Sequence, residues 1–335
     1  MSRPDVLLDR RLTSHMSAGM TTYARMLFEH VPKVAPDLAF SFAGDGDNFD
    51  LAEQLALPLQ IARTRPRLVH YPAPFVPLVT PAPFVMTVHD LIDLHYPQFG
   101  KRRVGPYYRY SVGPAARRAR AVITDDAMTI PDLKRFLGVD PGRVRIVPLG
   151  VDFPEPLPPR AIHPRPYLLY VGNHRPHKNV ITLARAWAAL PEGSGVDLLL
   201  TGESDVGDAF DALRRPDAEI VFLGQRTEAE LIGYYRAARA YVHPALREGF
   251  GLPLLEAMRA GVPVIATHGA LPSILAPHAY PFDAGDMEEL RALLVRVLDE
   301  PSHFERSAAA AQIATKALTW EATARATVAV YREFL

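Results

Sequence analysis

Residues 247–267 read REGFGLPLLEAMRAGVPVIAT, and this stretch indicates the fold more clearly than any other part of the chain. A Gly-Phe-Gly-Leu-Pro turn is followed by an apolar run with helical spacing and then by the short run VPVIA. A turn, a helix and a strand in this order are typical of parallel α/β folds. Pro253 fits the first turn of the helix, where its missing N–H costs no hydrogen bond.

The same stretch carries groups that suit a phosphorylated ligand. The backbone N–H groups of Phe250, Gly251 and Leu252 are expected to point outward at the positive end of the helix, which favours an anion. Glu248 precedes this helix and Glu256 falls within its first turns. Two carboxylates beside an anion-binding helix end suit a ligand with phosphates and sugar hydroxyls. The alternative is an ordinary strand–turn–helix with solvated glutamates.

With its two glutamates eight positions apart, the segment resembles the E-x7-E signature of the retaining glycosyltransferases of family 4. That family has the GT-B fold, which is an α/β fold of two Rossmann-like doubly wound domains facing a central cleft. The resemblance implies that Glu248 contacts the donor sugar and that Glu256 contacts a ribose hydroxyl.

A second candidate anion site is the loop at residues 171–179, which reads VGNHRPHKN. A predicted strand ends at Gly172, and Arg175 and Lys178 would bring positive charge to a diphosphate. The alternative is a solvated basic loop. The loop is similar to the G-x-x-x-P-[RH]-K-N segment of family 4, and this similarity implies that Lys178 and Arg175 hold the diphosphate of the donor.

In the first half, His89 stands at the end of a predicted strand, within the sequence TVHDLIDLHYP. A histidine at the carboxyl end of such a strand faces the edge where these folds bind ligands, although a lone histidine is more often structural. The stretch resembles the HDL-x5-P segment of family 4, which implies that His89 lies beside the reacting sugar. We expect Asp90 to be a capping or supporting group, and His70 and His95 to be structural.

The stretch SAGMTTY at residues 17–23 resembles the G-x-G-x-Y loop of family 4, which approaches the donor phosphates and the acceptor. Gly19 and Tyr23 match that pattern, so Gly19 is assigned to the acceptor and phosphate loop. Thr21 replaces the second glycine, and its side chain would limit close backbone approach. A second departure is Ser273, where relatives carry a glutamate.

Short apolar runs alternate with amphipathic stretches along the chain. They predict strands at residues 5–9, 38–43, 68–71, 84–88, 121–124, 144–148, 167–171, 196–200, 220–223, 240–242 and 262–266. Proline is dense in residues 151–166, so we expect a domain linker there. The predicted first domain is residues 1–150, the second is residues 167–318, and residues 319–335 resemble the closing helix of the family, which crosses back to the first domain.

Composition sets outer limits on function. The chain has 335 residues, of which 48% are hydrophobic and 22% charged, as expected for two globular domains. The absence of cysteine excludes disulfides, thiolate metal sites and cysteine nucleophiles. The formal net charge is zero, which gives no reason to expect nucleic acid as a partner.

The beginning of the chain lacks a signal-peptide pattern, and no run approaches the ~18 apolar residues of a membrane span. We therefore expect a cytoplasmic protein. Residues 101–120 combine Lys, Arg and Tyr without any acidic residue, which favours peripheral contact with an anionic membrane at the inner face. The alternative is a solvated helix face.

The pair Asp45 and Asp47 has the spacing of a metal-binding D-x-D motif. It sits in a Gly/Asp/Asn-rich stretch that is typical of turns. We therefore expect no metal and no other cofactor.

The resemblance implies a retaining hexosyltransferase in which His89, Glu248 and Lys178 are catalytic. The PHKN and HDL variants resemble bacterial polysaccharide mannosyltransferases, so GDP-mannose is the expected donor and a saccharide or lipid-linked saccharide the expected acceptor. Two alternatives stay open, a nucleotide-sugar 2-epimerase of the same fold and a non-catalytic nucleotide-sugar-binding partner.

Overall fold

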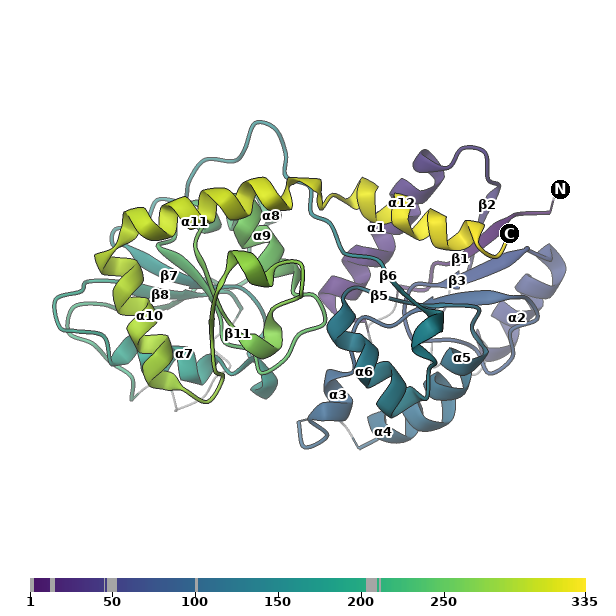
Figure 1. Ribbon diagram of the computed structural model, residues 1–335, viewed down its shortest axis with the longest axis horizontal. Coiled ribbons are helices and arrows are strands. Elements are labelled where there is room, and N and C mark those ends of the chain that lie inside the picture. The colour runs from purple at the N-terminus through teal and green to yellow at the C-terminus, as the bar shows by residue number, and fades with distance from the viewer. Residues whose placement is uncertain are drawn as a thin grey trace. The chain divides into compact units, whose positions relative to one another are not determined.

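The structure is a computed structural model that describes residues 3–12, 16–44, 46, 53–99, 102–202, 210 and 212–335. The chain forms two compact units (Figure 1). The first unit comprises Met1–Gly150 and Leu318–Leu335, and the second comprises Val151–Ala317.

The first unit contains a six-stranded sheet of order β2-β1-β3-β4-β5-β6 in which every neighbouring pair is parallel. Its strands are β1 (Val6–Asp9), β2 (Phe40–Ala43), β3 (Leu68–Tyr71), β4 (Phe84–Thr87), β5 (Val122–Thr124) and β6 (Val144–Ile146). Its α-helices are α1 (Ala18–Val34), α2 (Glu53–Thr64), α3 (Ile92–His95), α4 (Val104–Tyr107), α5 (Gly113–Arg118), α6 (Ile130–Asp132) and α12 (Trp320–Arg332).

Side chains alternate between the two faces of this sheet because successive residues of a strand point in opposite directions. Leu7, Val69 and Met86 pack in one core cluster with residues of α2 and α5. On the other face, His70 contacts α12, where its Nδ1 lies 2.6 Å from the hydroxyl of Tyr331. Both faces are therefore covered, which explains why the strands read as continuous apolar runs.

Helix α12 joins the beginning and the end of the chain in one unit. It packs along α1, and the hydroxyl of Thr323 donates a hydrogen bond of 2.9 Å to the carbonyl oxygen of Pro148. At its far end, Arg145 forms a bidentate ion pair with Glu333, at 2.7–3.0 Å. The last helix is thus an integral layer of the first unit.

The second unit contains a six-stranded parallel sheet of order β12-β11-β10-β7-β8-β9. Its strands are β7 (Tyr167–Tyr170), β8 (Asp197–Leu200), β9 (Ile220–Phe222), β10 (Ala240–His243), β11 (Val264–Thr267) and β12 (Tyr280–Phe282). Its α-helices are α7 (Val180–Ala188), α8 (Glu228–Ala237), α9 (Leu252–Ala260), α10 (Met287–Asp299) and α11 (Pro301–Ala314).

Helices cover both faces of the second sheet as well. Leu168, Leu198 and Val242 share a core cluster with residues of α7 and α10. Tyr241 points to the opposite face, where its ring meets that of Tyr235 from α8 at 5.5 Å between centroids.

All the strands predicted from the sequence are confirmed to within two residues at each end. Strand β12 was not predicted, because its short sequence Tyr-Pro-Phe contains a proline that removes a ladder donor. Its edge position in the sheet tolerates Pro281, since one side of an edge strand needs no partner.

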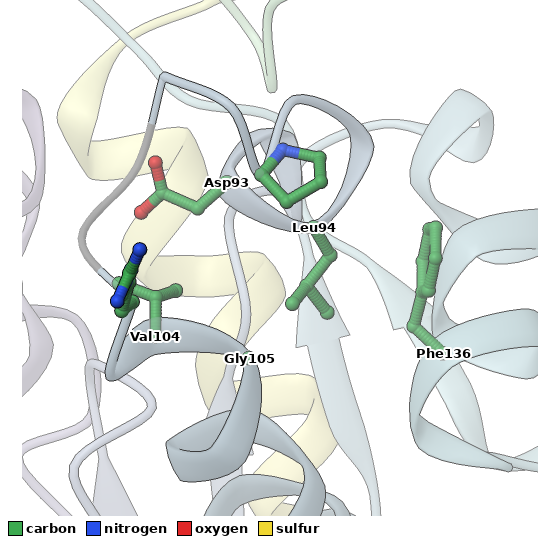
Figure 2. A pocket seen from close by; sticks show the side chains of 7 residues that line it. Asp93, Leu94, Val104, Gly105 and Phe136 are labelled. Atoms are coloured by element: carbon green, nitrogen blue, oxygen red, sulfur yellow. The ribbon is translucent and has the colours of Figure 1, made fainter.

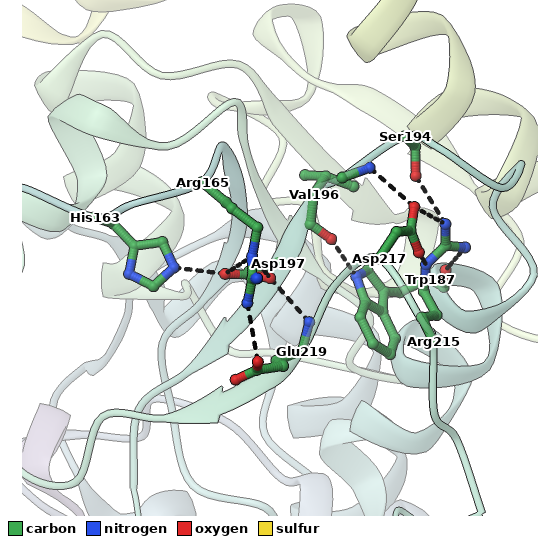
Figure 3. A network of polar contacts seen from close by, with 10 residues as sticks. His163, Arg165, Trp187, Ser194, Val196, Asp197, Arg215, Asp217 and Glu219 are labelled. Carbon is green, nitrogen blue, oxygen red and sulfur yellow. Dashed lines mark hydrogen bonds and ion pairs between the residues drawn. The ribbon is translucent and has the colours of Figure 1, made fainter.

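The proline-rich segment 151–166 has no helix or strand, and it packs against the second unit (Figure 3). The buried carboxylate of Asp197 lies 2.7 Å from Nε2 of His163 and accepts a hydrogen bond of 2.8 Å from Arg165. Arg236 of α8 donates to the carbonyl oxygen of Pro158. The segment is therefore an ordered part of the second unit rather than a free connector.

The chain passes between the units twice, after Gly150 and before Leu318. A Cβ atom on Gly150 would lie 2.1 Å from the carbonyl carbon of Thr319, closer than any real contact allows. Only glycine fits at position 150.

We predict that Gly150→Ala lowers the free energy of unfolding by about 1–3 kcal/mol, because the added methyl group overpacks against backbone that cannot rotate away. Chemical denaturation would measure the change. The control is Gly285→Ala, where a Cβ meets nothing within 4 Å. Equal stability of the two variants would contradict this interpretation of Gly150.

Candidate active site

In the second unit, the two loops singled out from the sequence lie at the carboxyl ends of neighbouring strands. Gly172 to Lys178 follows β7, and the stretch from Pro244 to Gly251 follows β10. The amide of Leu246 donates a hydrogen bond of 2.8 Å to the carbonyl oxygen of His177. The structure thus brings the two predicted anion-binding segments together at the edge where doubly wound sheets bind ligands.

A partly buried charge cluster links these loops. The ammonium group of Lys178 forms an ion pair with Oε1 of Glu248, and Nε2 of His243 lies 2.8 Å from the same oxygen. His243 in turn lies 2.7 Å from the hydroxyl of Tyr241 through Nδ1. Since a carboxylate only accepts, Nε2 of His243 carries a proton, and in the neutral ring Nδ1 accepts from Tyr241.

Electrostatics keep Glu248 ionised. Burial acts to raise the pKa of this carboxyl group, but the charge of Lys178 and the hydrogen bond from His243 outweigh burial and lower the pKa to about 2. Burial lowers the pKa of His243, which keeps its ring neutral. The cluster at neutral pH therefore contains one cation and one anion.

His243 was missed in the sequence analysis. Its signal was a histidine at the last position of a buried strand, directly before a proline. Nothing in the sequence shows that a histidine at this position reaches the glutamate five residues later, because the path of the intervening loop decides it.

Glu256 lies one turn into α9 and has a different environment. Its Oε2 accepts a hydrogen bond of 3.0 Å from the hydroxyl of Tyr235. Burial raises its pKa to about 7, against the effect of the Tyr235 hydrogen bond, and the negative charge of Glu228 adds to the rise. Glu256 therefore changes its charge near neutral pH.

The sequence predicted an anion site at the N–H groups of Phe250, Gly251 and Leu252, and α9 begins at the last of these residues. Gly251 has a φ of +73°, a left-handed conformation that glycine adopts without strain, and the helix begins at Leu252 with Pro253 in its first turn. Phe250 is buried before this turn. The first N–H groups of a helix have no partner within it, so this end can receive an anion.

Gly172 and Arg175 border the same loop. A Cβ on Gly172 would lie 2.7 Å from the hydroxyl of Tyr170, which donates to the carbonyl oxygen of Asn173. The side chain of Arg175 is exposed, and its amide donates to Oδ1 of Asn173. The guanidinium group is therefore open to a ligand, whereas Gly172 shapes the loop.

In the first unit, His89 follows β4 at the carboxyl edge of the sheet. Its Nδ1 lies 2.7 Å from Oδ2 of Asp125, a residue that was not predicted as part of a site. Asp90 accepts a hydrogen bond of 3.0 Å from the amide of Ile92, so its predicted capping role is confirmed. His70 bonds to Thr87 and Tyr331, consistent with a structural role.

The interpretation of residues 17–23 as a loop was wrong. Ser17 caps α1 by accepting a hydrogen bond from the amide of Met20, and the helix begins at Ala18. Gly19 therefore lies in the first helical turn, where Thr21 and Tyr23 follow on the helix. A serine cap before a run of good helix formers favours this outcome over a glycine loop.

The basic segment that begins at residue 101 forms α4, a π-helical turn (Tyr108–Val112) and α5, while Lys101 itself lies outside the described residues. A hollow of about 300 Å³ opens beside α3 and α4. Figure 2 shows the carboxylate of Asp93 on one side of this hollow and the ring of Phe136 on the other, with Leu94 between them. None of the predicted site residues lines it.

Asp45 and Asp47 lie outside the described residues. Within the ranges that the structure describes, no three His, Asp or Glu side chains are grouped so as to hold a metal ion. The helices in those ranges are all too short or too polar to cross a membrane.

Comparison with known proteins defines the class of the chain. A family model described as "Glycosyltransferase Family 4" matches residues 22–155, and one described as "Glycosyl transferases group 1" matches residues 158–317. The chain belongs to the glycosyltransferases of family 4, as the sequence motifs predicted, and is a hexosyltransferase.

Its relatives include bacterial mannosyltransferases. The chain is 27% identical over 267 residues to the O-antigen chain mannosyltransferase B of Escherichia coli. The matched region covers 74% of this chain and 70% of the relative. It is 30% identical over 227 residues to the MMP alpha-(1->4)-mannosyltransferase of Mycolicibacterium hassiacum. This matched region covers 65% of this chain and 55% of the relative. The match thus spans only about half the length of the second relative.

A solved structure supports the fold. The sucrose-phosphate synthase of Thermosynechococcus elongatus superposes with a TM-score of 0.76 over 99% of both chains at 21% identity. At this identity the likeness shows the fold alone. Together with the two parallel six-stranded sheets, it establishes the GT-B fold of two Rossmann-like units.

We predict that affinity for a nucleotide-sugar donor increases between pH 6 and pH 8, because ionised Glu256, whose expected partner is a ribose hydroxyl, accepts hydrogen bonds better than the protonated carboxyl group. The midpoint should lie near the pKa of about 7. Isothermal titration calorimetry across this range would measure it, and the diphosphate diester of the ligand does not itself titrate there.

Two variants sharpen this test. Glu256→Gln should abolish the pH dependence, whereas Tyr235→Phe should move the midpoint to higher pH, because the Tyr235 hydroxyl lowers the pKa of Glu256. A pH profile unchanged in Glu256→Gln would remove Glu256 from the donor site.

Proposed function

We propose that this chain is a retaining mannosyltransferase that moves mannose from GDP-mannose onto a saccharide or lipid-linked saccharide in surface polysaccharide biosynthesis. The observation that carries this proposal is the partly buried ion pair of Lys178 and Glu248, held beside the N-terminus of α9. The names of the two mannosyltransferase relatives support mannose as the sugar.

The donor diphosphate is proposed to lie between the start of α9 and the loop that carries Arg175 and Lys178. Departure of a nucleoside diphosphate leaves new negative charge on its terminal phosphate. Fixed positive charge and N–H groups aimed at that phosphate stabilise the departing group. The protein thus contributes mainly electrostatic stabilisation of the leaving group.

Lys178 forms an ion pair with Glu248 before a donor binds. The positive charge of Lys178 is therefore fixed in position and has a partner. The arriving diphosphate would share the ammonium group, since Lys178 has three N–H donors. His243 holds the same Oε1 of Glu248, so Oε2 is the oxygen that we assign to the sugar hydroxyls. Glu248 is thereby a donor-sugar ligand that stays anionic.

Retention without a nucleophile from the protein requires attack on the same face that the diphosphate leaves. In this mechanism the acceptor hydroxyl forms the new glycosidic bond, the bond between the anomeric carbon and the diphosphate breaks, and the leaving phosphate takes the acceptor proton. Glu256 holds the ribose, and in the first unit His89 binds a sugar hydroxyl.

A panel of nucleotide sugars tests the proposed function. We expect transfer of mannose from GDP-mannose, with retention observed by NMR, and no loss of activity in excess chelator. Product formed from UDP-N-acetylglucosamine without an acceptor would indicate the 2-epimerase instead. Donor binding without turnover or hydrolysis on any acceptor would indicate a non-catalytic binding partner.

We predict that Lys178→Ala lowers kcat by about 10²–10³-fold through lost stabilisation of the leaving group. Steady-state kinetics would measure this loss. The matched control is Lys316→Ala, an exposed lysine of the same unit. Unchanged kcat and KM in Lys178→Ala would exclude Lys178 from the site.

Lys178→Ala also leaves the partly buried Glu248 without its cation, which destabilises a protein. Thermal denaturation of Lys178→Ala and of the double variant with Glu248→Gln separates the two effects. The double variant should regain stability but not activity.

The peripheral membrane contact predicted for residues 101–120 and the cytoplasmic location stay predictions.

A further inference from the structure

The pairing of His89 with Asp125 is not explained by the family motif that identified His89. Strands β4 and β5 are parallel neighbours, with Thr87 in register with Ile123. The residues that follow them therefore meet at the carboxyl edge of the sheet, where Nδ1 of His89 lies 2.7 Å from Oδ2 of Asp125. The exposed fraction of Asp125 is 1%, and that of His89 is 9%.

The imidazole ring is also held from the side. The ring of Tyr23, from α1, meets it edge to face at 4.7 Å between centroids. Tyr23 is fixed by a hydrogen bond of 2.9 Å between its hydroxyl and that of Thr87. His70 lies 2.9 Å from the same Thr87 hydroxyl. These contacts leave His89 little freedom to turn.

The other nitrogen of the ring, Nε2, is enclosed by the protein, and the backbone carbonyl of Pro72 acts with the carboxylates to raise the pKa of His89. Among the described residues, Nε2 of His89 is buried and has no hydrogen-bond partner. An unsatisfied buried polar atom costs about 1–3 kcal/mol. A polar atom kept in this state at the ligand-binding edge of a doubly wound sheet is typical of a group that awaits a ligand.

Four titratable groups face His89 from the elements packed around it: Asp125 after β5, Asp90 beside it in the chain, Tyr23 of α1 and His70 of β3. Burial lowers the pKa of His89, but the two carboxylates raise it, and the net direction is upward. Asp90 is already bonded to the amide of Ile92. Asp125 thus makes the direct contact with the ring.

We propose that Asp125 is a positioning residue, which keeps a proton on Nδ1 of His89 and aims Nε2 at a hydroxyl group of the sugar or the acceptor. With a neutral ring, Nε2 accepts a hydrogen bond from that hydroxyl. With a protonated ring, Nε2 donates one to the hydroxyl oxygen. In both states the carboxylate fixes which nitrogen meets the ligand, a role that rests on the proposed transferase function.

The test compares Asp125→Asn with Asp126→Asn, the same substitution at the next residue. The control keeps its turn, because an asparagine can still accept the hydrogen bond that the amide of Met128 donates to Oδ1 of Asp126. NMR of isotope-labelled histidine would follow the titration of His89 in each variant. A carboxylate this close shifts a pKa by about 1–3 units, so the midpoint should fall by about one unit or more in Asp125→Asn alone.

Kinetics provide the second measurement. Asp125→Asn should lower kcat/KM by about 10²-fold, because a ring that can turn no longer presents Nε2 in the productive geometry. In a double-mutant cycle with His89→Gln, the two losses should not add, since Asp125 acts only through His89. Thermal denaturation verifies that each variant is folded, and the cycle remains informative if one variant is partly destabilised.

An unchanged His89 midpoint in Asp125→Asn would overturn the inference, as would additive losses in the cycle or a shifted midpoint with unaltered kcat/KM. Failure of the proposed function looks different, because wild type and every variant would then lack transferase activity. Failure of this inference alone leaves wild type active as a transferase.

Discussion

The ion pair between Lys178 and Glu248 is the interaction on which the proposed chemistry depends. Removing two charges from water costs several kcal/mol for each ion unless geometry and further hydrogen bonds compensate. Here His243 supplies the further hydrogen bond on Glu248, and Tyr241 fixes His243. These contacts hold Glu248, and with it the ammonium group of Lys178, at the place that we assign to the departing phosphate.

Each unit has a histidine that contacts a carboxylate at the carboxyl edge of its parallel sheet. The two histidines use different ring nitrogens for this contact. His243 uses Nε2 toward Glu248, whereas His89 uses Nδ1 toward Asp125. Both ring nitrogens of His243 contact protein groups, whereas Nε2 of His89 is the nitrogen that we assign to a ligand.

Local sequence patterns predicted the strands, the start of α9 and the loops with Lys178 and Glu248, because each depends on a few adjacent residues. Neither Asp125 nor His243 was predicted, since their roles arise from strand order and loop path. Residues 17–23 were assigned to a loop, because a motif with Gly19 outweighed the capping signal of Ser17. The motif located the segment correctly but not its backbone conformation.

The return of α12 to the first unit has a consequence for the architecture of the chain. In topological terms, Val151–Ala317 is an insertion into a host domain, since the chain leaves the host after Gly150 and returns to it at Leu318. The backbones at Gly150 and Thr319 touch, so the two ends of the insertion leave the host at one point. A short peptide bridge there would close the host without the insertion.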